Sequence, residues 1–70
     1  MDRELALDWL VFLRERQPHK RIELSHRRNQ LDVSSKPARQ AAIRHLEELA
    51  MQYPTDYLVF QTQRRLMGKQ

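Results

Sequence analysis

The chain has 70 residues, with 13 basic and 9 acidic side chains, a formal net charge of +4 and no cysteine. This length predicts a single domain over residues 1–70, and the lack of cysteine excludes disulfides and thiolate metal sites. No apolar run reaches the roughly 18 residues of a membrane-spanning helix, and the first residues lack a signal-peptide pattern, so we expect a cytoplasmic protein without a membrane partner. The sequence shows no histidine pair with metal-ligand spacing, no glycine-rich phosphate loop and no carboxylate pair beside a base, which predicts a protein that binds rather than catalyses, without metal or cofactor.

The positive charge is concentrated in two parts of the chain. Residues 14–28 carry six basic and two acidic side chains, and residues 51–70 carry three basic side chains and one acidic. Ten of the 13 basic residues are arginine, whose planar guanidinium binds phosphates and base edges bidentately. This pattern predicts a polyanionic partner, although a GC-rich genome would also raise the arginine content.

Residues 2–16 are predicted to form the first helix, which Pro18 ends. Among residues 5–13 only Asp8 interrupts the apolar side chains, whereas a surface helix carries a single apolar stripe. A core this small supplies little stability, so we expect a second copy or another protein to cover part of the helix. The alternative is that the helix is central in the monomer. The predicted homodimer or partner interface consists of Leu7, Trp9, Val11 and Phe12.

The segment 20–33 fits two structures. Its apolar residues alternate with polar ones at both ends, as in a β-hairpin over residues 21–33, which would give an α+β fold. The same residues also suit a short helix over residues 23–31, and the connection lacks the glycine that a tight hairpin favours. We favour the helix, and with it a mainly α fold.

Residues 35–52 are predicted to form a long helix. Ser34 or Ser35 can cap it, Pro37 falls in its first turn, and Pro54 stops it. Its apolar face is expected to comprise Ala38, Ala42, Leu46, Leu49 and Tyr53.

Residues 57–62 have the highest β propensity in the chain. They predict either a strand or a short C-terminal helix capped by Thr55 or Asp56. From about residue 64 the chain is basic, and we expect a frayed tail there.

Residues 23–49 read as a short helix, the turn Leu31-Asp32-Val33-Ser34 and a longer helix that continues through Ile43-Arg44-His45-Leu46-Glu47. This segment resembles the helix-turn-helix of winged-helix DNA-binding proteins, with residues 57–62 in the place of the β wing. The resemblance departs from the family pattern in three respects. Asp32 replaces the turn glycine, Arg28 occupies a small-residue position, and the interval from Ser34 to Ile43 is one residue longer.

The resemblance implies a small regulatory or architectural protein that binds double-stranded DNA, with its recognition helix in the major groove. Arg39 and Arg44 would then read guanine, Gln40 adenine, and Lys36 a phosphate, whereas the alternative is a solvated polar helix face. A function of another class is an adaptor or inhibitor that docks on a protein through the first helix. The further expected phosphate contacts are Arg27, Arg28, Arg64 and Arg65.

Overall fold

Helices account for most of residues 1–68, the part of the chain that the computed structural model describes. A single-turn 3-10 helix, η1 (Pro18–Lys20), joins the first two α-helices. The α-helices are α1 (Arg3–Arg16), α2 (Arg21–Asp32), α3 (Lys36–Gln52) and α4 (Pro54–Leu66). The predicted mainly α fold is therefore confirmed.

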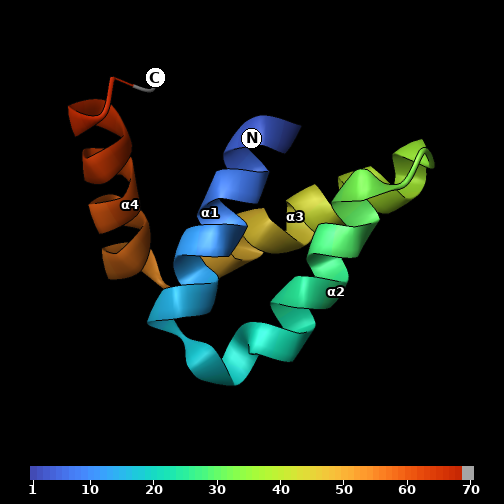
Figure 1. The fold of residues 1–70 in the computed structure, drawn as a ribbon, viewed down its shortest axis with the longest axis horizontal. Helices are drawn as coiled ribbons and strands as arrows, with labels where there is room; N and C mark the ends of the chain where they lie inside the picture. Colours follow the sequence, from blue (N-terminus) through green and yellow to red (C-terminus); the bar gives the residue numbers. More distant parts are fainter. Residues whose placement is uncertain (69–70) are drawn as a thin grey trace.

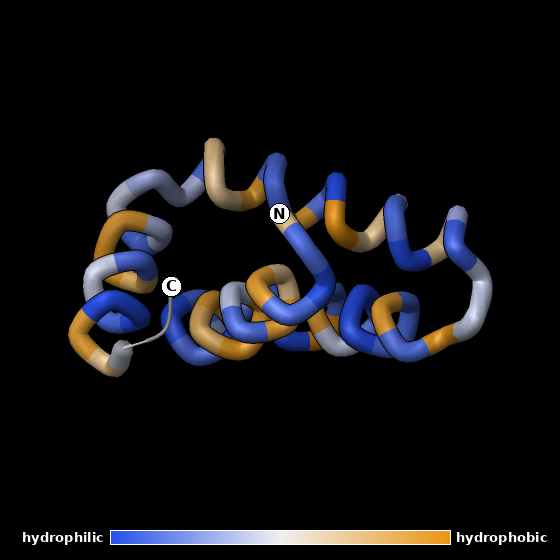
Figure 2. The backbone as a smooth tube through the Cα atoms, turned by 90° about the horizontal axis from the view of Figure 1, so that it is seen from above, coloured by the Kyte–Doolittle hydropathy of each residue, from blue (hydrophilic) through white to orange (hydrophobic). Residues whose placement is uncertain are grey.

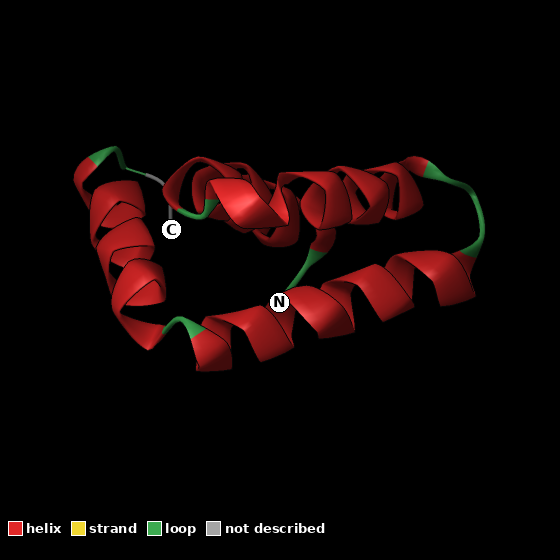
Figure 3. Cartoon of the chain, turned by 90° about the horizontal axis from the view of Figure 1, so that it is seen from below, coloured by secondary structure: helices red, strands yellow, loops and turns green. Residues whose placement is uncertain are grey.

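The helices form two layers, and α4 crosses one end of them (Figures 2 and 3). α1 and α2 lie side by side in one layer, and α3 runs back across both in the other. α4 contacts α1 and α3, so α4 and α2 lie on opposite sides of α1 (Figure 1). The connections are short: residues 33–35 join α2 to α3, and Tyr53 joins α3 to α4, as in helical hairpins.

Within residues 1–68 the core consists of ten buried residues drawn from α1, α2, α3 and α4. Trp9 is at its centre, where its Nε1 donates a hydrogen bond to the Leu46 carbonyl at 3.0 Å. Its ring lies 4.9 Å from that of Tyr57 and 5.4 Å from that of Phe60, centroid to centroid, so α4 is attached to α1 by aromatic packing. The buried residues are Ala6, Trp9, Leu10, Leu13, Leu24, Leu31, Ala42, Leu46, Leu49 and Phe60.

The hairpin alternative for residues 21–33 is wrong. In a strand, Ile22 and Leu24 would share one face of the sheet. In the helix that forms instead, Leu24 is fully buried while Ile22 is 88% exposed. Leu31, two helical turns after Leu24, joins it in the core, so helical periodicity determines which apolar residues of this segment are buried.

The strand alternative for residues 57–62 is also wrong, since these residues belong to α4. Their β propensity is overridden because a helix places Tyr57 and Phe60 together against α1. No strand occurs within residues 1–68, so the expected wing is not formed there. The chain also remains helical to Leu66 where a frayed tail was expected; Lys69, part of that tail, lies outside the described residues.

Candidate nucleic-acid interface

The predicted reading face of α3 is divided by the structure. Lys36, Gln40 and Arg44 are exposed on its N-terminal half. Arg39 is half-buried, and its Nη1 donates a hydrogen bond to the Val33 carbonyl at 2.9 Å. Arg39 therefore stabilises the connection between α2 and α3 and does not extend outward as a base-reading side chain would.

Carboxylates adjoin this face and reduce its positive charge. Glu47 follows Arg44 by three residues, so the two share a side of α3. Its Oε2 lies 2.6 Å from the amino group of Met1, and Glu48 beside it is exposed. The positive charge of α3 is consequently confined to its N-terminal half, from Lys36 to Arg44.

The two predicted arginine pairs are each split between a structural and an exposed member. Arg27 is half-buried and donates from Nη1 to the Gln30 side chain at 2.9 Å, whereas Arg28 is exposed. Arg64 forms an ion pair with Asp8 of α1, and its side chain is 16% exposed; Arg65 is exposed. Arg27 and Arg64 thus contribute to the fold, which weakens the expectation that they bind phosphate.

The predicted interface on the first helix is largely covered by the chain itself. Trp9 is fully buried, so it cannot take part in an exposed interface, which corrects that prediction. Leu7 and Phe12 are partly buried against the core, and Val11 is 38% exposed. The alternative, that this helix is central in the monomer, describes the observed packing.

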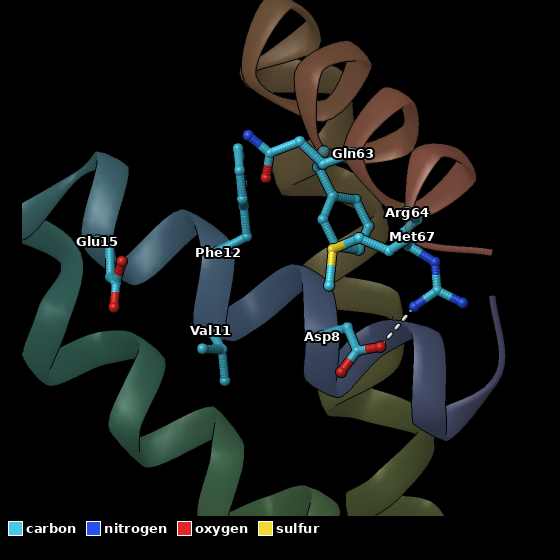
Figure 4. Close-up of a pocket in the computed structure, with 8 residues that line it drawn as sticks. Asp8, Val11, Phe12, Glu15, Gln63, Arg64 and Met67 are labelled. Atoms are coloured by element: carbon cyan, nitrogen blue, oxygen red, sulfur yellow. Dashed lines mark hydrogen bonds and ion pairs between the residues drawn. The ribbon is translucent and has the colours of Figure 1, made fainter. Parts of the chain in front are cut away.

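A groove of about 300 Å³ lies between α1 and α4 (Figure 4). Phe12 and Val11 of α1 and Phe60 and Met67 from the α4 side provide its apolar surface, and the Asp8–Arg64 ion pair borders it. Val11 and Phe12, two residues of the interface predicted on the first helix, line this groove, so this part of the predicted interface remains open to a partner.

A row of arginines follows the outer junction of α1 and α2, which we call the α1–α2 seam: Arg14, Arg21 and Arg28. Sequence reasoning named Arg28 as a phosphate contact but missed Arg14 and Arg21. Arg14 and Arg21 line a pocket of about 370 Å³ together with Glu15 and Pro18. Arg28 follows Arg21 by seven residues, so the two guanidinium groups leave the same side of α2, about 10 Å apart along its axis. The spacing of Arg21 and Arg28 is visible in the sequence, but the position of Arg14 beside them requires the fold.

In the part of the chain that the structure describes, the three seam arginines have no partner, a property that they share with Lys36, Arg44 and Arg65. Within residues 1–68 none of the three forms a hydrogen bond or ion pair. In contrast, Arg3 lies 2.9 Å from Asp32, Arg16 lies 3.0 Å from Asp56, and Lys20 lies 3.7 Å from Glu23. Within the described residues, positive charge without a partner is therefore found on the seam, on Lys36 and Arg44 of α3, and on Arg65 of α4.

The opposite side of α2, which faces α3, is electrically balanced. Glu23 Oε2 lies 2.9 Å from His45 Nε2 of α3, and this hydrogen bond, with the charge of Lys20, lowers the pKa of the Glu23 carboxyl. The cations of α2 that have no partner, Arg21 and Arg28, therefore lie on its seam side.

Other features define what this interface lacks. Within residues 1–68 no group of three histidine or carboxylate side chains is arranged to hold a metal ion. None of the helices in the same range has both the length and the apolar character that a bilayer crossing requires. The chain matches no family model, and neither curated proteins nor solved structures include a significant match to it. The site's own chemistry is therefore the basis for any function.

Proposed function

We propose that the protein is a small DNA-binding regulator or architectural protein that binds the phosphate backbone of double-stranded DNA through the α1–α2 seam and acts as a homodimer. The observation that carries this proposal is the set of three arginines, Arg14, Arg21 and Arg28, without partners on one side of the molecule. Folding normally neutralises arginine or spreads it over the surface, and a row of unpaired guanidinium groups is the footprint of a polyanion.

The spacing along the seam supports a nucleic-acid backbone as the partner. Arg21 and Arg28 are about 10 Å apart along α2, and the phosphates of one DNA strand recur about every 3.4 Å along the duplex axis. Two long side chains at this separation can each contact a different phosphate of one strand. The pocket between Arg14 and Arg21 gives a third contact at the end of the row.

The aromatic residues favour a duplex over a single strand. Proteins that bind single strands stack bases on exposed aromatic side chains. Here Trp9 and Phe60 are buried, and Phe12, Tyr53 and Tyr57 are partly buried against the core. Within the described residues no tryptophan, tyrosine or phenylalanine ring belongs to an exposed residue, so none of them offers an open stacking surface.

A helix-turn-helix mode, in which α3 enters the major groove, is a second way for the same protein to bind DNA. Lys36, Gln40 and Arg44 are the side chains that remain exposed for it. Contacts by α3 would provide base preference, whereas contacts by the seam would provide affinity that is independent of sequence. The two surfaces are separable by mutation because they lie on different helices.

The test compares two matched pairs of charge removals in a binding titration against a labelled random duplex at low salt. Arg21→Gln/Arg28→Gln removes two charges from the seam, and Lys36→Gln/Arg44→Gln removes two charges from α3. We expect the seam pair to weaken binding by at least about tenfold more than the α3 pair, since each lost phosphate contact removes counterion release. An equal or larger loss for the α3 pair would move the site to α3. Absence of binding by the wild-type chain at low salt would overturn the DNA-binding proposal.

An adaptor that docks on another protein is the second candidate, and the α1–α4 groove is the observation in its favour. Val11 is 38% and Met67 71% exposed there. In this case Val11→Gln abolishes capture of the protein partner and leaves duplex binding unchanged, whereas Arg21→Gln/Arg28→Gln leaves the capture intact.

A further inference from the structure

The outward face of α4 carries apolar side chains along just over two helical turns. Leu58 is 63% and Leu66 82% exposed, and Thr62 lies between them at intervals of four residues, so the three form one stripe along the helix. We call Leu58, Thr62 and Leu66 the α4 stripe. The Thr62 hydroxyl donates to the Leu58 carbonyl at 2.9 Å, so its polar group is already satisfied.

Two of the three charged side chains of α4, Asp56 and Arg64, point toward α1 and away from the stripe. Asp56 accepts hydrogen bonds from Arg16 and Gln17 of the α1 end, and Arg64 pairs with Asp8 of α1. A peripheral helix usually turns its apolar side to the core and its charges to water. α4 instead uses two of its charged residues to dock on α1 and leaves apolar side chains outside, with Arg65 as the charged residue nearest the stripe.

We propose that a second copy of the chain covers the α4 stripe, with the two α4 helices packed antiparallel about a twofold axis at Thr62. This inference rests on the homodimer of the proposed function and assigns its interface. The stripe has the same order in both directions: leucine, threonine, leucine. A twofold axis therefore places Leu58 of one copy on Leu66 of the other, with the small threonines facing each other where the backbones approach most closely, which is the self-complementarity that a twofold interface requires.

The charge pattern agrees with this occupant and excludes a polyanion. Arg65 lies on the same edge of the helix as Leu58, so in the antiparallel arrangement its aliphatic stem can pack beside Leu58 of the other copy while its guanidinium stays in water. The two copies of Arg65 lie on one rim of the interface, offset by about 9 Å along the helix axis, with both guanidinium groups in water. An uncharged stripe offers nothing to a phosphate backbone.

The position of α4 leaves the seam free in such a dimer. α2 lies on the other side of α1 from α4 (Figure 1). Contact through the α4 stripe therefore keeps the α1–α2 seam of each copy exposed, and the dimer presents two seams to one duplex.

Disulfide trapping tests the register directly, because the chain contains no cysteine that would interfere. Helices packed about 8–10 Å apart bring residues on the twofold axis within the roughly 4.4–6.8 Å between Cα atoms that a disulfide needs. We expect Thr62→Cys to form a crosslinked dimer under mild oxidation. Leu58→Cys should crosslink with Leu66→Cys in a mixture but poorly with itself. Ile22→Cys, at a position that is 88% exposed on α2, is the control for random collision. Crosslinking of Thr62→Cys no faster than that of Ile22→Cys would overturn the interface.

Sedimentation equilibrium supplies a second measurement that does not depend on a new thiol. Leu58→Gln/Leu66→Gln should raise the dimer dissociation constant by at least about tenfold, because two leucines in each copy lose their cover. Ile22→Gln/Met51→Gln, at two comparably exposed apolar positions, should leave it unchanged. Circular dichroism checks that both variants stay folded. A wild-type monomer at every concentration would overturn the homodimer and its interface together; a dimer that is insensitive to the stripe variant would overturn the interface alone. Duplex binding is measured separately and decides neither.

Discussion

Asp56 shows at the scale of one residue how the end of α1 is fixed to α4. Its carboxylate accepts hydrogen bonds from Gln17 Nε2 at 3.0 Å and from the Arg16 guanidinium at 3.0 and 3.1 Å. The hydrogen bond from Gln17, followed by those from Arg16, lowers the pKa of the Asp56 carboxyl despite the opposing effect of desolvation. The folded structure therefore stabilises the ionised form of Asp56 relative to its protonated form, more than the unfolded chain does.

This lowered pKa predicts an acid-dependent contribution to stability. A carboxyl whose pKa is lower in the folded state stabilises it fully above the unfolded value, about 3.9 for aspartate, and the contribution is lost as the pH falls through the folded value. We expect Asp56→Asn to be less stable than the wild type at neutral pH, with a difference that shrinks steadily below about pH 4. Thermal melts followed by circular dichroism between pH 2 and pH 7 measure this difference.

Two further variants identify the cause. Gln17→Ala keeps the carboxyl but removes its principal donor, so the acid-dependent difference should be smaller than in the wild type. Gln61→Ala, an exposed glutamine of the same helix as Asp56, should leave the pH profile unchanged. A stability difference between wild type and Asp56→Asn that is the same at pH 2 and pH 7 would show that the lost packing, not the charge, matters.

Residue roles were the part of the candidate site least accessible to sequence reasoning. Arg39 and Arg64 look like free cations in the sequence, yet the Val33 carbonyl binds one and Asp8 the other. Asp8 and Arg64 are 56 positions apart. Such pairings follow from how helices pack, and the local sequence carries no record of them.

At the scale of single helices, the N-termini of α1 and α3 differ in how they are capped. Asp2 lies in extended backbone before α1, and its Oδ1 accepts a hydrogen bond from the Leu5 N–H at 2.8 Å. Ser35 occupies the corresponding position before α3 but makes no side-chain cap hydrogen bond. The expectation that a serine caps α3 is therefore met in position only.

The contrast predicts unequal effects of two alanine substitutions. Asp2→Ala removes a real acceptor and a negative charge near the helix N-terminus, and it should cost about 0.5–2 kcal/mol. Ser35→Ala removes no hydrogen bond and should change the free energy of unfolding by less than about 0.5 kcal/mol. Urea unfolding followed by Trp9 fluorescence measures both. A loss for Ser35→Ala equal to that for Asp2→Ala would mean that the serine caps α3 in solution.

Helix prediction succeeded where one periodicity dominated and was ambiguous where two competed. The bounds expected for α1 and α3 differ from the observed ones by one residue at the N-terminus, because prolines and a continuous apolar pattern fix both ends. Residues 20–33 and 57–62 also fit alternation. Burial in the core explains why both segments are helical: Leu24, Leu31 and Phe60 are buried there, and they are placed there by helical spacing.

At the scale of the whole molecule, the two-layer arrangement separates surfaces of different character. α2 and α4 flank α1 on opposite sides (Figure 1), so the arginine seam and the α4 stripe face different directions. The sequence indicated both a basic surface and surplus apolar surface, but it assigned the first mainly to α3 and the second to α1. Trp9 packs into the core, and two of the most exposed apolar side chains, Leu58 and Leu66, lie on α4 instead.

This separation makes the salt dependence of DNA binding a measure of both surfaces at once. The logarithm of the binding constant falls with the logarithm of the salt concentration by about 0.9 per phosphate contacted. Three seam arginines in one copy therefore predict a slope of about −3, and a dimer with both seams on one duplex predicts about −5. We expect the wild type to show the steeper slope and Leu58→Gln/Leu66→Gln, titrated under the same conditions, to show the shallower one. Arg21→Gln/Arg28→Gln should flatten the slope in either background. A slope that the stripe variant leaves unchanged would mean that each copy binds alone, and one that the seam variant leaves unchanged would mean that these arginines contact no phosphate.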